Sequence, residues 1–392
     1  MKRRISFWRV ATVLILGAFA VATYLRFTGG LARVTNLSDS FPWGLWVAFD
    51  ILCGVGLAAG GFTVAAMVYL FGWERYRPVL RPAILTAFLG YLLVVFALLF
   101  DLGKPWNVWH PLVMYNPHSV MFEVGWCVML YTTVLALEFA PSVWQKLRWG
   151  RGLLIWKRIT VPLVLAGVLL STLHQSSLGS LFLIMPQKIH PLWFSNLLPI
   201  LFFISAVGVG LAMVIVESYF SSRAFGREIE WHLLSDFGKF MILPMLIMAV
   251  LRGFDLFQSG GLALAFAATP EAALFWLEIG LSILAPLVLI LVFGASDRPK
   301  LLMVTAFLSV GGFILNRINV SITAIDATVR AGYFPSFWEV VISLGVVTLG
   351  CVVFATAAKY LPIYENEPLV ERWKRPVYVW ESAPAPKRDA VS

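Results

Sequence analysis

The sequence has few charged residues and few of the residue types that build metal or covalent catalytic sites. Only 13% of its 392 residues are charged, and it contains three cysteines and five histidines. Cys53, Cys127 and Cys351 each lie inside an apolar run without a nearby cysteine, so neither a disulfide framework nor a CxxC metal site is expected. We interpret them as small core residues. Three separate cysteines also offer no ligand set for an iron–sulfur cluster.

Several motifs of soluble enzymes are absent as well. The chain has no H-E-x-x-H zinc helix, no phosphate-binding glycine loop and no Gly-x-Ser-x-Gly nucleophile elbow. One histidine, His174, falls within an apolar run, and the others are His110, His118, His190 and His232. A haem in a membrane cytochrome is held by histidines buried in the helices. We therefore predict no haem, and no flavin or metal site either.

Apolar residues are abundant, and their arrangement predicts membrane-spanning helices. Hydrophobic residues make up 60% of the chain and aromatic residues 15%. Runs of about eighteen apolar residues are long enough to cross a hydrocarbon core of roughly 30 Å, at about 1.5 Å per helical residue. Ten spans are predicted, over residues 7–26, 43–71, 82–101, 119–140, 159–178, 193–218, 237–257, 271–294, 300–318 and 338–361. The sequence therefore predicts an all-α integral membrane protein with about ten transmembrane helices.

The basic residues are distributed unequally between the two sides of the predicted spans. An even number of spans places both termini on one side. Seven of the 30 Lys and Arg residues lie on the opposite side, namely Arg26, Arg33, Lys104, Lys188, Arg252, Arg317 and Arg330. By the positive-inside rule, both termini are expected to be cytoplasmic. The net charge of +9 thus encodes orientation, and a nucleic-acid partner is not expected.

The two ends of the chain differ in character. MKRR followed by an apolar run and an Ala-Phe-Ala sequence is similar to a secretory signal peptide. The run begins early, at Phe7, and continues past that site, so we interpret it as a retained first helix. Residues 1–361 are predicted to form a single transmembrane domain, followed by a solvated and partly disordered cytoplasmic tail over 362–392.

Polar side chains concentrate at the ends of the spans that face away from the termini. Even-numbered spans begin there, with Glu339 at the start of its span, Glu123 one turn inside, and Asp50 and Glu278 deeper, two turns inside. Odd-numbered spans end there with Asp101, with His174, Gln175 and Ser176, with Arg252 and Asp255, and with Asn316, Arg317 and Asn319. The cytoplasmic halves hold Glu138 and Glu217. An ionisable group in a span costs about 2.5–3.5 kcal/mol on insertion scales, so we expect this outer polar layer to have a function.

Structural explanations compete for several of these residues. The helix dipole favours an acid in a first turn by about 0.3–1 kcal/mol, which accounts equally well for Glu123 and Glu339. Asp50 lies roughly 10 Å inside its helix at about 1.5 Å per residue. That is too deep for the dipole alone, so Asp50 is predicted to be functional or part of a network. Asp255 is three residues from Arg252 and is expected to pair with it.

Two short patterns concern packing and repetition. Gly56 and Gly60, four residues apart, are typical of membrane helices that approach closely. Phe-Glu-Val-Gly at 122–125 and Leu-Glu-Ile-Gly at 277–280 indicate a weak internal repeat of spans two to five on spans six to nine. The match is short, and chance is the alternative explanation.

The outer layer combines a titratable histidine, carboxylates and apolar walls, which suits a lipid-soluble substrate that exchanges protons in a redox reaction. A quinone has an apolar tail and two carbonyl acceptors, and it takes up two protons on reduction. A histidine titrates near neutral pH, so His174 is predicted to donate to a carbonyl or to accept from the quinol, with the carboxylates as proton relays. The candidate catalytic residues are His174, Asp101, Asp50 and Glu123, and the candidate quinone-binding residues are His174, Gln175, Ser176, Asp50 and Arg252. The alternatives are a structural hydrogen bond from His174 to a neighbouring helix, and an Arg252 that holds a carboxylate in place.

Several segments resemble one family of membrane subunits. FPWGLWVAFDILCGVGLAAGGF at 41–62, RPA at 81–83, ALEFAP at 136–141, LHQSSLGSL at 173–181 with HPLW at 190–193, and YFPSFWE at 333–339 are similar to the HybB branch of the NrfD/polysulfide-reductase family. The resemblance runs over nearly the whole chain. It implies a haem-free, quinone-reactive subunit with two four-helix bundles, here approximately 43–178 and 193–318, plus flanking helices. The cytochrome b label often given to this branch conflicts with the histidine count.

The resemblance also implies partners and a site location. Such subunits exchange electrons with a periplasmic, ferredoxin-like iron–sulfur protein and its catalytic enzyme, a nickel–iron hydrogenase or a multihaem cytochrome. Their pocket for menaquinone or ubiquinone lies near the outer end of the first bundle, which here contains Asp50, Asp101, Glu123 and His174. The candidate docking residues in the outer loops are Trp106, Trp109, Pro111 and Tyr115. The alternative functions are a passive membrane anchor, a secondary transporter or a proton channel.

Overall fold

The computed structural model has the helical architecture that the sequence predicts. It describes residues 7–41 and 43–364. Within these residues, ten helical segments are long and apolar enough to cross a membrane, and no strand is present. The prediction of an all-α membrane protein is thereby confirmed, and the chain is a multi-pass membrane protein. The predicted tail lies, from residue 365 onward, outside the described residues.

Five spans occupy the first half of the chain. They are α1 (Phe7–Gly29), a second span made of η2 (Trp46–Cys53), α2 (Gly54–Leu57), α3 (Gly60–Ala65) and η3 (Ala66–Leu70), and then α4 (Arg77–Asp101), α5 (Val120–Lys146) and α6 (Gly150–Leu183). Short 3₁₀ turns lie between them: η1 (Leu31–Arg33), η4 (Glu74–Tyr76), η5 (Pro105–Asn107) and η6 (His110–Leu112). The segments η2 and η3 are π-helical, a form that is frequent at functional sites.

Five further spans follow after the turn η7 (Pro186–Lys188). They are α7 (Leu198–Phe225), then α8 (Trp231–Phe240) with α9 (Ile242–Gln258), then α11 (Pro270–Ile279) with η8 (Gly280–Leu284) and α12 (Ala285–Leu291), then α13 (Pro299–Ile318) with η10 (Asn319–Thr323) and α14 (Ala324–Val329), and finally α15 (Phe337–Tyr360). The short segments α10 (Leu262–Ala265) and η9 (Ala295–Asp297) lie in the connections.

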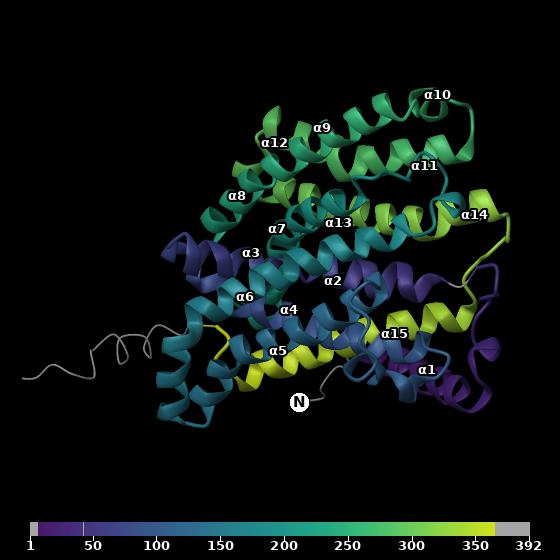
Figure 1. Ribbon diagram of the computed structural model, residues 1–392. Helices are drawn as coiled ribbons and strands as arrows, with labels where there is room; N and C mark the ends of the chain where they lie inside the picture. Colours follow the sequence, from purple (N-terminus) through teal and green to yellow (C-terminus); the bar gives the residue numbers. More distant parts are fainter. Residues whose placement is uncertain (1–6, 42, 365–392) are drawn as a thin grey trace, which may run out of the picture.

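The helices form two bundles with a flanking pair. In the first bundle, α5 packs against α4 and α6, and α3 packs against α4. In the second, α13 packs against α7, α11 and α12, and α7 packs against α9. Figure 1 shows α9, α11 and α12 at the top of the view and α4, α5 and α15 in the lower half. Although α15 comes last in the chain, it packs against α1 and α4 and so flanks the first bundle.

The two bundles meet where glycines allow α3 and α7 to touch. A Cβ added to Gly60 would lie 2.9 Å from the carbonyl oxygen of Gly210, and one added to Gly210 would lie 2.7 Å from the backbone nitrogen of Gly60. Side chains cannot occupy either space without moving a backbone. The close approach predicted for the Gly56–Gly60 pair is therefore real at Gly60.

The helix ends differ from the predicted ones where polar residues continue a helix beyond its apolar run. Helix α6 begins at Gly150 rather than 159 and ends at Leu183 rather than 178, and α5 extends to Lys146 through Pro141. Backbone hydrogen bonds continue a helix whatever its side chains are, whereas hydropathy detects only the apolar part. These extensions carry the helices past the hydrocarbon core.

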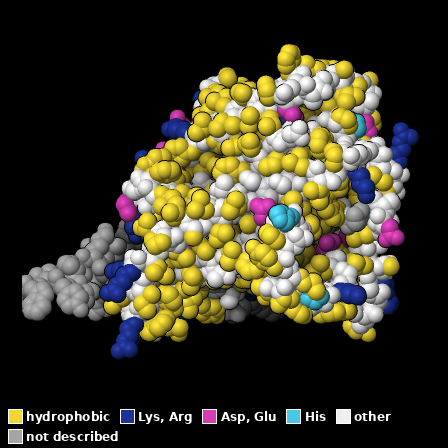
Figure 2. Space-filling view, viewed as in Figure 1, with side chains coloured by type: hydrophobic (Ala, Val, Ile, Leu, Met, Phe, Trp, Pro, Cys, Tyr) yellow, Lys and Arg dark blue, Asp and Glu magenta, His cyan; other side chains and the backbone are white. Residues whose placement is uncertain are grey.

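The surface between the two ends of the molecule is apolar, as lipid contact requires. Figure 2 shows hydrophobic side chains over most of the visible face, with Lys and Arg side chains gathered toward the left and right ends. Leu165, Leu169 and Leu173 of α6 are among the exposed residues of this band. Cys53 and Cys127 are buried as predicted, but Cys351 is exposed. The core assignment of Cys351 was wrong, because apolar character does not distinguish the lipid-facing from the inward-facing side of a membrane helix.

Candidate functional site

His174 belongs to a buried polar cluster between α4, α5 and α6. Its side chain has no exposed area, and its ring centroid lies 5.5 Å from that of Tyr91 on α4. Tyr91 meets Tyr131 on α5 edge to face at 4.6 Å, and Ser171, almost one turn before His174, neighbours both tyrosines. Neither His174 nitrogen and none of the three hydroxyls makes a hydrogen bond of normal geometry with the described residues. Because buried polar groups are normally paired, this cluster has unused capacity for water or a ligand.

Glu123 connects this cluster to the molecular surface. It lies in the first turn of α5, after the N-cap residue Ser119, and its side chain is exposed. Its Oε1 accepts a hydrogen bond of 2.6 Å from the hydroxyl of Ser177 on α6. Ser177 is buried and follows His174 by almost one helical turn. Glu123 and Ser177 are therefore hydrogen-bonded, and Ser177 and His174 lie on one face of α6. We call these three residues the Glu123–Ser177–His174 line. Ser177 was not predicted, although its spacing from His174 places both on one helical face.

Gln175 and Ser176, the neighbours of His174, have different surroundings. The Gln175 amide is buried and donates to the carbonyl oxygen of Val55 at 3.1 Å, which ties α6 to α2. Ser176 is half-buried, and its carbonyl oxygen accepts from the Ser180 hydroxyl at 3.2 Å. Gln175 thus fixes the position of α6 against the glycine-rich second span.

Asp50 and Asp101 lie at another seam, where the first bundle meets α1 and α15. Asp50 in η2 is buried and accepts a hydrogen bond of 2.6 Å from Ser343 of α15. Asp101 is the last residue of α4 and neighbours Arg26, which donates to two carbonyl oxygens at the end of that helix at 2.7 and 2.6 Å. The Asp101 Oδ1 atom is buried without a partner. The predicted carboxylates are thus divided between the α15 seam and the α5–α6 line.

Glu339 and Glu138 have contrasting environments. Glu339 completes the capping box of α15 with Ser336, and its carboxylate also accepts from the Tyr333 hydroxyl at 2.5 Å and the Asn36 backbone at 3.1 Å. The structural explanation therefore holds for Glu339. Glu138 of α5 is buried toward the other membrane face, beside Gly167.

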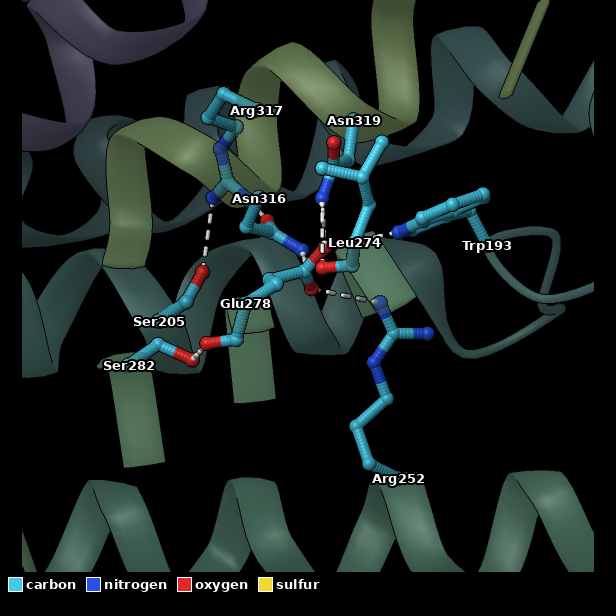
Figure 3. A network of polar contacts seen from close by, with 9 residues as sticks. All are labelled: Trp193, Ser205, Arg252, Leu274, Glu278, Ser282, Asn316, Arg317 and Asn319. Carbon is cyan, nitrogen blue, oxygen red and sulfur yellow. Dashed lines mark hydrogen bonds and ion pairs between the residues drawn. The ribbon is translucent and has the colours of Figure 1, made fainter. Parts of the chain in front are cut away.

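A second polar cluster lies inside the second bundle, centred on Glu278 (Figure 3). Glu278 of α11 is 1% exposed. Its Oε1 accepts from Asn316 at 2.6 Å, and its Oε2 accepts from Asn319 at 2.9 Å and from the Trp193 indole at 2.8 Å. The Arg252 Nη2 atom lies 3.8 Å from Oε1. Arg252 is thus separated from the other predicted quinone-binding residues, which lie in the first bundle.

The expected pairing of Asp255 with Arg252 is wrong. Asp255 accepts a hydrogen bond of 2.6 Å from Ser195, while Arg252 turns toward Glu278. Residues three apart share a helical face only approximately, and here Arg252 is buried whereas Asp255 is partly exposed. Trp193 was not predicted as a partner of Glu278, because it lies in an irregular connection where no periodicity indicates its direction.

His190 begins the HPLW motif in the same connection between the bundles. Its backbone nitrogen donates to the Ala324 carbonyl at 2.9 Å, and its ring packs against Trp193 with centroids 5.8 Å apart. Partial burial lowers the pKa of His190 below its ordinary value of 6.5, and the nearby Glu271 opposes this shift. The neutral imidazole is therefore favoured beside Trp193.

The fold and these clusters define a multi-pass helical membrane protein with polar groups inside both bundles. The family described as "Polysulphide reductase, NrfD" matches residues 33–329, and the chain belongs to this family. It is 40% identical to a protein of Nitratidesulfovibrio vulgaris, over 92% of this chain and 95% of that one. It is 34% identical to the "Probable Ni/Fe-hydrogenase 2 b-type cytochrome subunit" of Escherichia coli, over 90% and 92% of the two chains. It is 25% identical to the "Menaquinone reductase, integral membrane subunit" of Nitratidesulfovibrio vulgaris, over 93% of each. The predicted family is confirmed.

The Escherichia coli relative is named a b-type cytochrome subunit, which implies a haem. The histidines of this chain do not fit one. His174 is buried in a span, and His232 now falls in the first turn of α8, because the seventh span begins at Trp231 rather than 237. The His232 side chain is exposed, however, so it does not face His174 inside a bundle. The remaining histidines are His110, His118 and His190, which lie in connections. A pair of buried axial ligands is not formed by these residues.

Proposed function

We propose that this chain is the haem-free, quinone-reactive membrane subunit of a respiratory oxidoreductase complex. The observation that carries the proposal is the Glu123–Ser177–His174 line: a buried histidine with two unpaired nitrogens lies three residues along α6 from a serine that donates to the exposed Glu123 carboxylate. The names of two relatives support this class of function, since one is a hydrogenase subunit and the other a menaquinone reductase subunit. The substrate is a membrane quinone, menaquinone or ubiquinone.

The proposed chemistry at this line is proton exchange with the quinone headgroup. Reduction adds two electrons and two protons to the quinone and gives the quinol, and oxidation reverses both transfers. Glu123 supplies or accepts a proton at the surface, and the Ser177 hydroxyl passes it toward the His174 imidazole, which is free to bond a headgroup oxygen. Gln175 and Ser176 border the same turn, and Asp50 and Asp101 are proposed as further proton relays at the α15 seam.

The electrons are proposed to cross a docking surface beside this line. The connection between α4 and α5 exposes Trp106, Trp109 and Tyr115, whereas Pro111 is half-buried and accepts from the Trp126 indole at 2.9 Å. Exposed aromatic side chains are enriched in protein interfaces. The proposed partner is a periplasmic, ferredoxin-like iron–sulfur subunit with its catalytic enzyme, a hydrogenase or multihaem cytochrome. We propose accordingly that the chain lies in a bacterial inner membrane with both termini in the cytoplasm.

The test is quinone turnover by the complete complex carrying His174→Ala or Glu123→Gln. We expect His174→Ala to abolish quinone turnover and Glu123→Gln to lower kcat by about 10²-fold, the scale of a lost proton-transfer group. Assembly, followed by co-purification of the partner subunits, should be unchanged. Asp39→Asn is the matched control, since Asp39 is an exposed acid on the same predicted side. Normal turnover in both variants would contradict the proposal.

The rival functions give different outcomes in related measurements. A passive anchor would tolerate simultaneous neutralisation of Asp50, Asp101 and His174 without loss of quinone-linked activity. A secondary transporter would move substrate into vesicles that contain no redox partner. A haem would give a pyridine haemochrome spectrum from the purified chain, which we expect not to see.

A further inference from the structure

A cavity in the second bundle lies beside the Glu278 cluster and apart from the proposed quinone site. It measures about 40 Å³ and is bounded by α7, α9, α11, η8 and α13. Its walls include the apolar side chains of Ile204, Met245 and Phe313. Its polar lining residues are Ser205, Arg252, Glu278, Ser282, Ser309 and Asn316, so a carboxylate borders the cavity together with the guanidinium. A site of about 10–15 Å³ on this measure holds one water, so the cavity accommodates roughly three.

Arg252 reaches this cavity with donors that no residue accepts. Its side chain is 4% exposed, and the nearest carboxylate oxygen, Glu278 Oε1, is 3.8 Å from Nη2. Both Nε and Nη1 are buried without a hydrogen-bond partner. Figure 3 shows the guanidinium meeting Glu278 through one nitrogen, with the other two directed away from the labelled side chains. The oxygens of Glu278 accept three shorter hydrogen bonds from other residues, and neither Nε nor Nη1 of Arg252 bonds to them.

The cluster also holds a surplus of positive charge. Arg317, 2% exposed, is a second buried guanidinium, which donates to the Asn316 side chain at 2.5 Å and to Ser205 at 2.8 Å. Rings of Phe202 and Phe313 lie 3.6 and 4.4 Å from its centre. Within this cluster, the two buried guanidiniums therefore share one buried carboxylate, that of Glu278, while Asp255 is partly exposed and accepts from Ser195. A buried charge without a counterion is strongly unfavourable.

We propose that this cavity binds a small monovalent anion of the size of chloride. Arg252 supplies two free donors, Ser309 adds a buried hydroxyl on the cavity wall, and the anion neutralises the excess guanidinium charge. Water satisfies the donors but not the charge, and a larger organic anion does not fit. The π-helical turn η8, which carries Ser282 to the cavity edge, marks the same place as locally distorted. The site does not depend on the proposed quinone chemistry.

The first experiment locates the anion directly. The full-length protein is crystallised with bromide in place of chloride at about 0.1 M, below the concentrations at which halides decorate protein surfaces. An anomalous peak within hydrogen-bond distance of Arg252 Nε or Nη1 is expected. Its absence, or the same density from crystals grown in gluconate, overturns the proposal in favour of water.

The second experiment measures the effect of the anion on stability. The Tm of the full-length protein in detergent should rise saturably with chloride and not with gluconate at equal ionic strength, since an anion that binds the folded protein stabilises it. Arg252→Gln should remove this dependence and Arg252→Lys should weaken it, while Arg33→Gln, which changes an exposed arginine, should leave it unchanged. Equal responses to chloride in wild type and Arg252→Gln would overturn the proposal, as would equal responses to both anions.

Discussion

The two bundles place an equivalent glutamate in opposite environments. Glu123 and Glu278 occupy the same position of the short repeat Phe-Glu-Val-Gly and Leu-Glu-Ile-Gly. In both bundles a side chain of the fourth helix donates to this acid at 2.6 Å, Ser177 in the first and Asn316 in the second. The Glu123 carboxylate is otherwise exposed, whereas that of Glu278 is enclosed by two asparagines, a tryptophan and an arginine.

This difference separates a reactive arrangement from a structural one. A carboxylate with one partner and access to the surface can gain and lose a proton without disturbing the fold. A buried carboxylate that accepts several hydrogen bonds positions the groups around it. We propose that the glutamate at this position of the short repeat exchanges protons in the first bundle, whereas in the second bundle it holds the neighbouring side chains in place.

The largest expected effect is the loss of stability on Glu278→Ala. This substitution leaves Asn316, Asn319 and Trp193 without their acceptor and Arg252 without its counterion. We expect a loss of about 3–5 kcal/mol, the cost of breaking a buried ion pair. Glu123→Ala should change stability little, because the side chain is exposed. Thermal unfolding of the purified protein, followed by tryptophan fluorescence, compares the two. Equal losses would remove the contrast between the bundles.

A smaller effect is expected when the side chain that donates to either glutamate, Asn316 or Ser177, is replaced. Asn316→Ala should destabilise by about 1.5–3 kcal/mol, because a hydrogen bond to a buried charge is lost. Ser177→Ala should leave the midpoint of unfolding nearly unchanged and slow quinone turnover instead, since it interrupts the line to His174. Measuring both quantities for both variants sharpens the comparison. A turnover loss confined to Asn316→Ala would reverse the assignment of roles.

The stability of the contact between the bundles should depend on the volume of the residue at position 210. Gly210→Ala places a Cβ 2.7 Å from a backbone atom of Gly60, so we expect a loss of about 1–3 kcal/mol, typical of overpacking. Gly253→Ala is the matched control, because an added Cβ meets nothing within 4 Å there. Chemical unfolding in mixed micelles measures both. A neutral Gly210→Ala would show that α3 and α7 can separate at no cost.

The smallest expected effect is on the pH dependence of stability. It involves His190, in the connection that also carries Trp193, a donor to Glu278. The pKa of His190 is lowered in the folded protein, so the unfolded chain binds this proton more readily. Stability should therefore decrease as the pH falls below about 6.5, the ordinary histidine value. His190→Gln should remove this contribution. The midpoint of thermal unfolding between pH 7.5 and about pH 5 tests it, and a steeper loss in the variant would contradict the expectation.

Most of the fold was predictable because membrane spans are encoded by length and hydropathy. Ten apolar runs gave ten spans, and only their ends were missed, as at Gly150 of α6, where polar residues continue the helix. Which faces of the helices pack together was harder to predict from the sequence. Hydropathy does not tell which face of α15 meets lipid, so the exposure of Cys351 was not foreseen.

The polar layer was predictable as a set of residues, but not as a set of contacts. Span ends indicated that Glu123, His174, Glu278 and Arg252 lie near one membrane face. The helix that each side chain meets depends on bundle geometry, which one helical period does not determine. That is why Arg252 was grouped with His174 in the sequence and lies beside Glu278 in the structure.

The position of α15 has a practical consequence for exchanging parts between relatives. The stretch matching the family ends at residue 329, yet the hydroxyl that meets Asp50 belongs to Ser343. A chimera that transplanted only the matching stretch would bring a foreign terminal helix to that aspartate. A chimera should therefore take helix α15 and the first half of the molecule from the same relative, although they lie at opposite ends of the sequence.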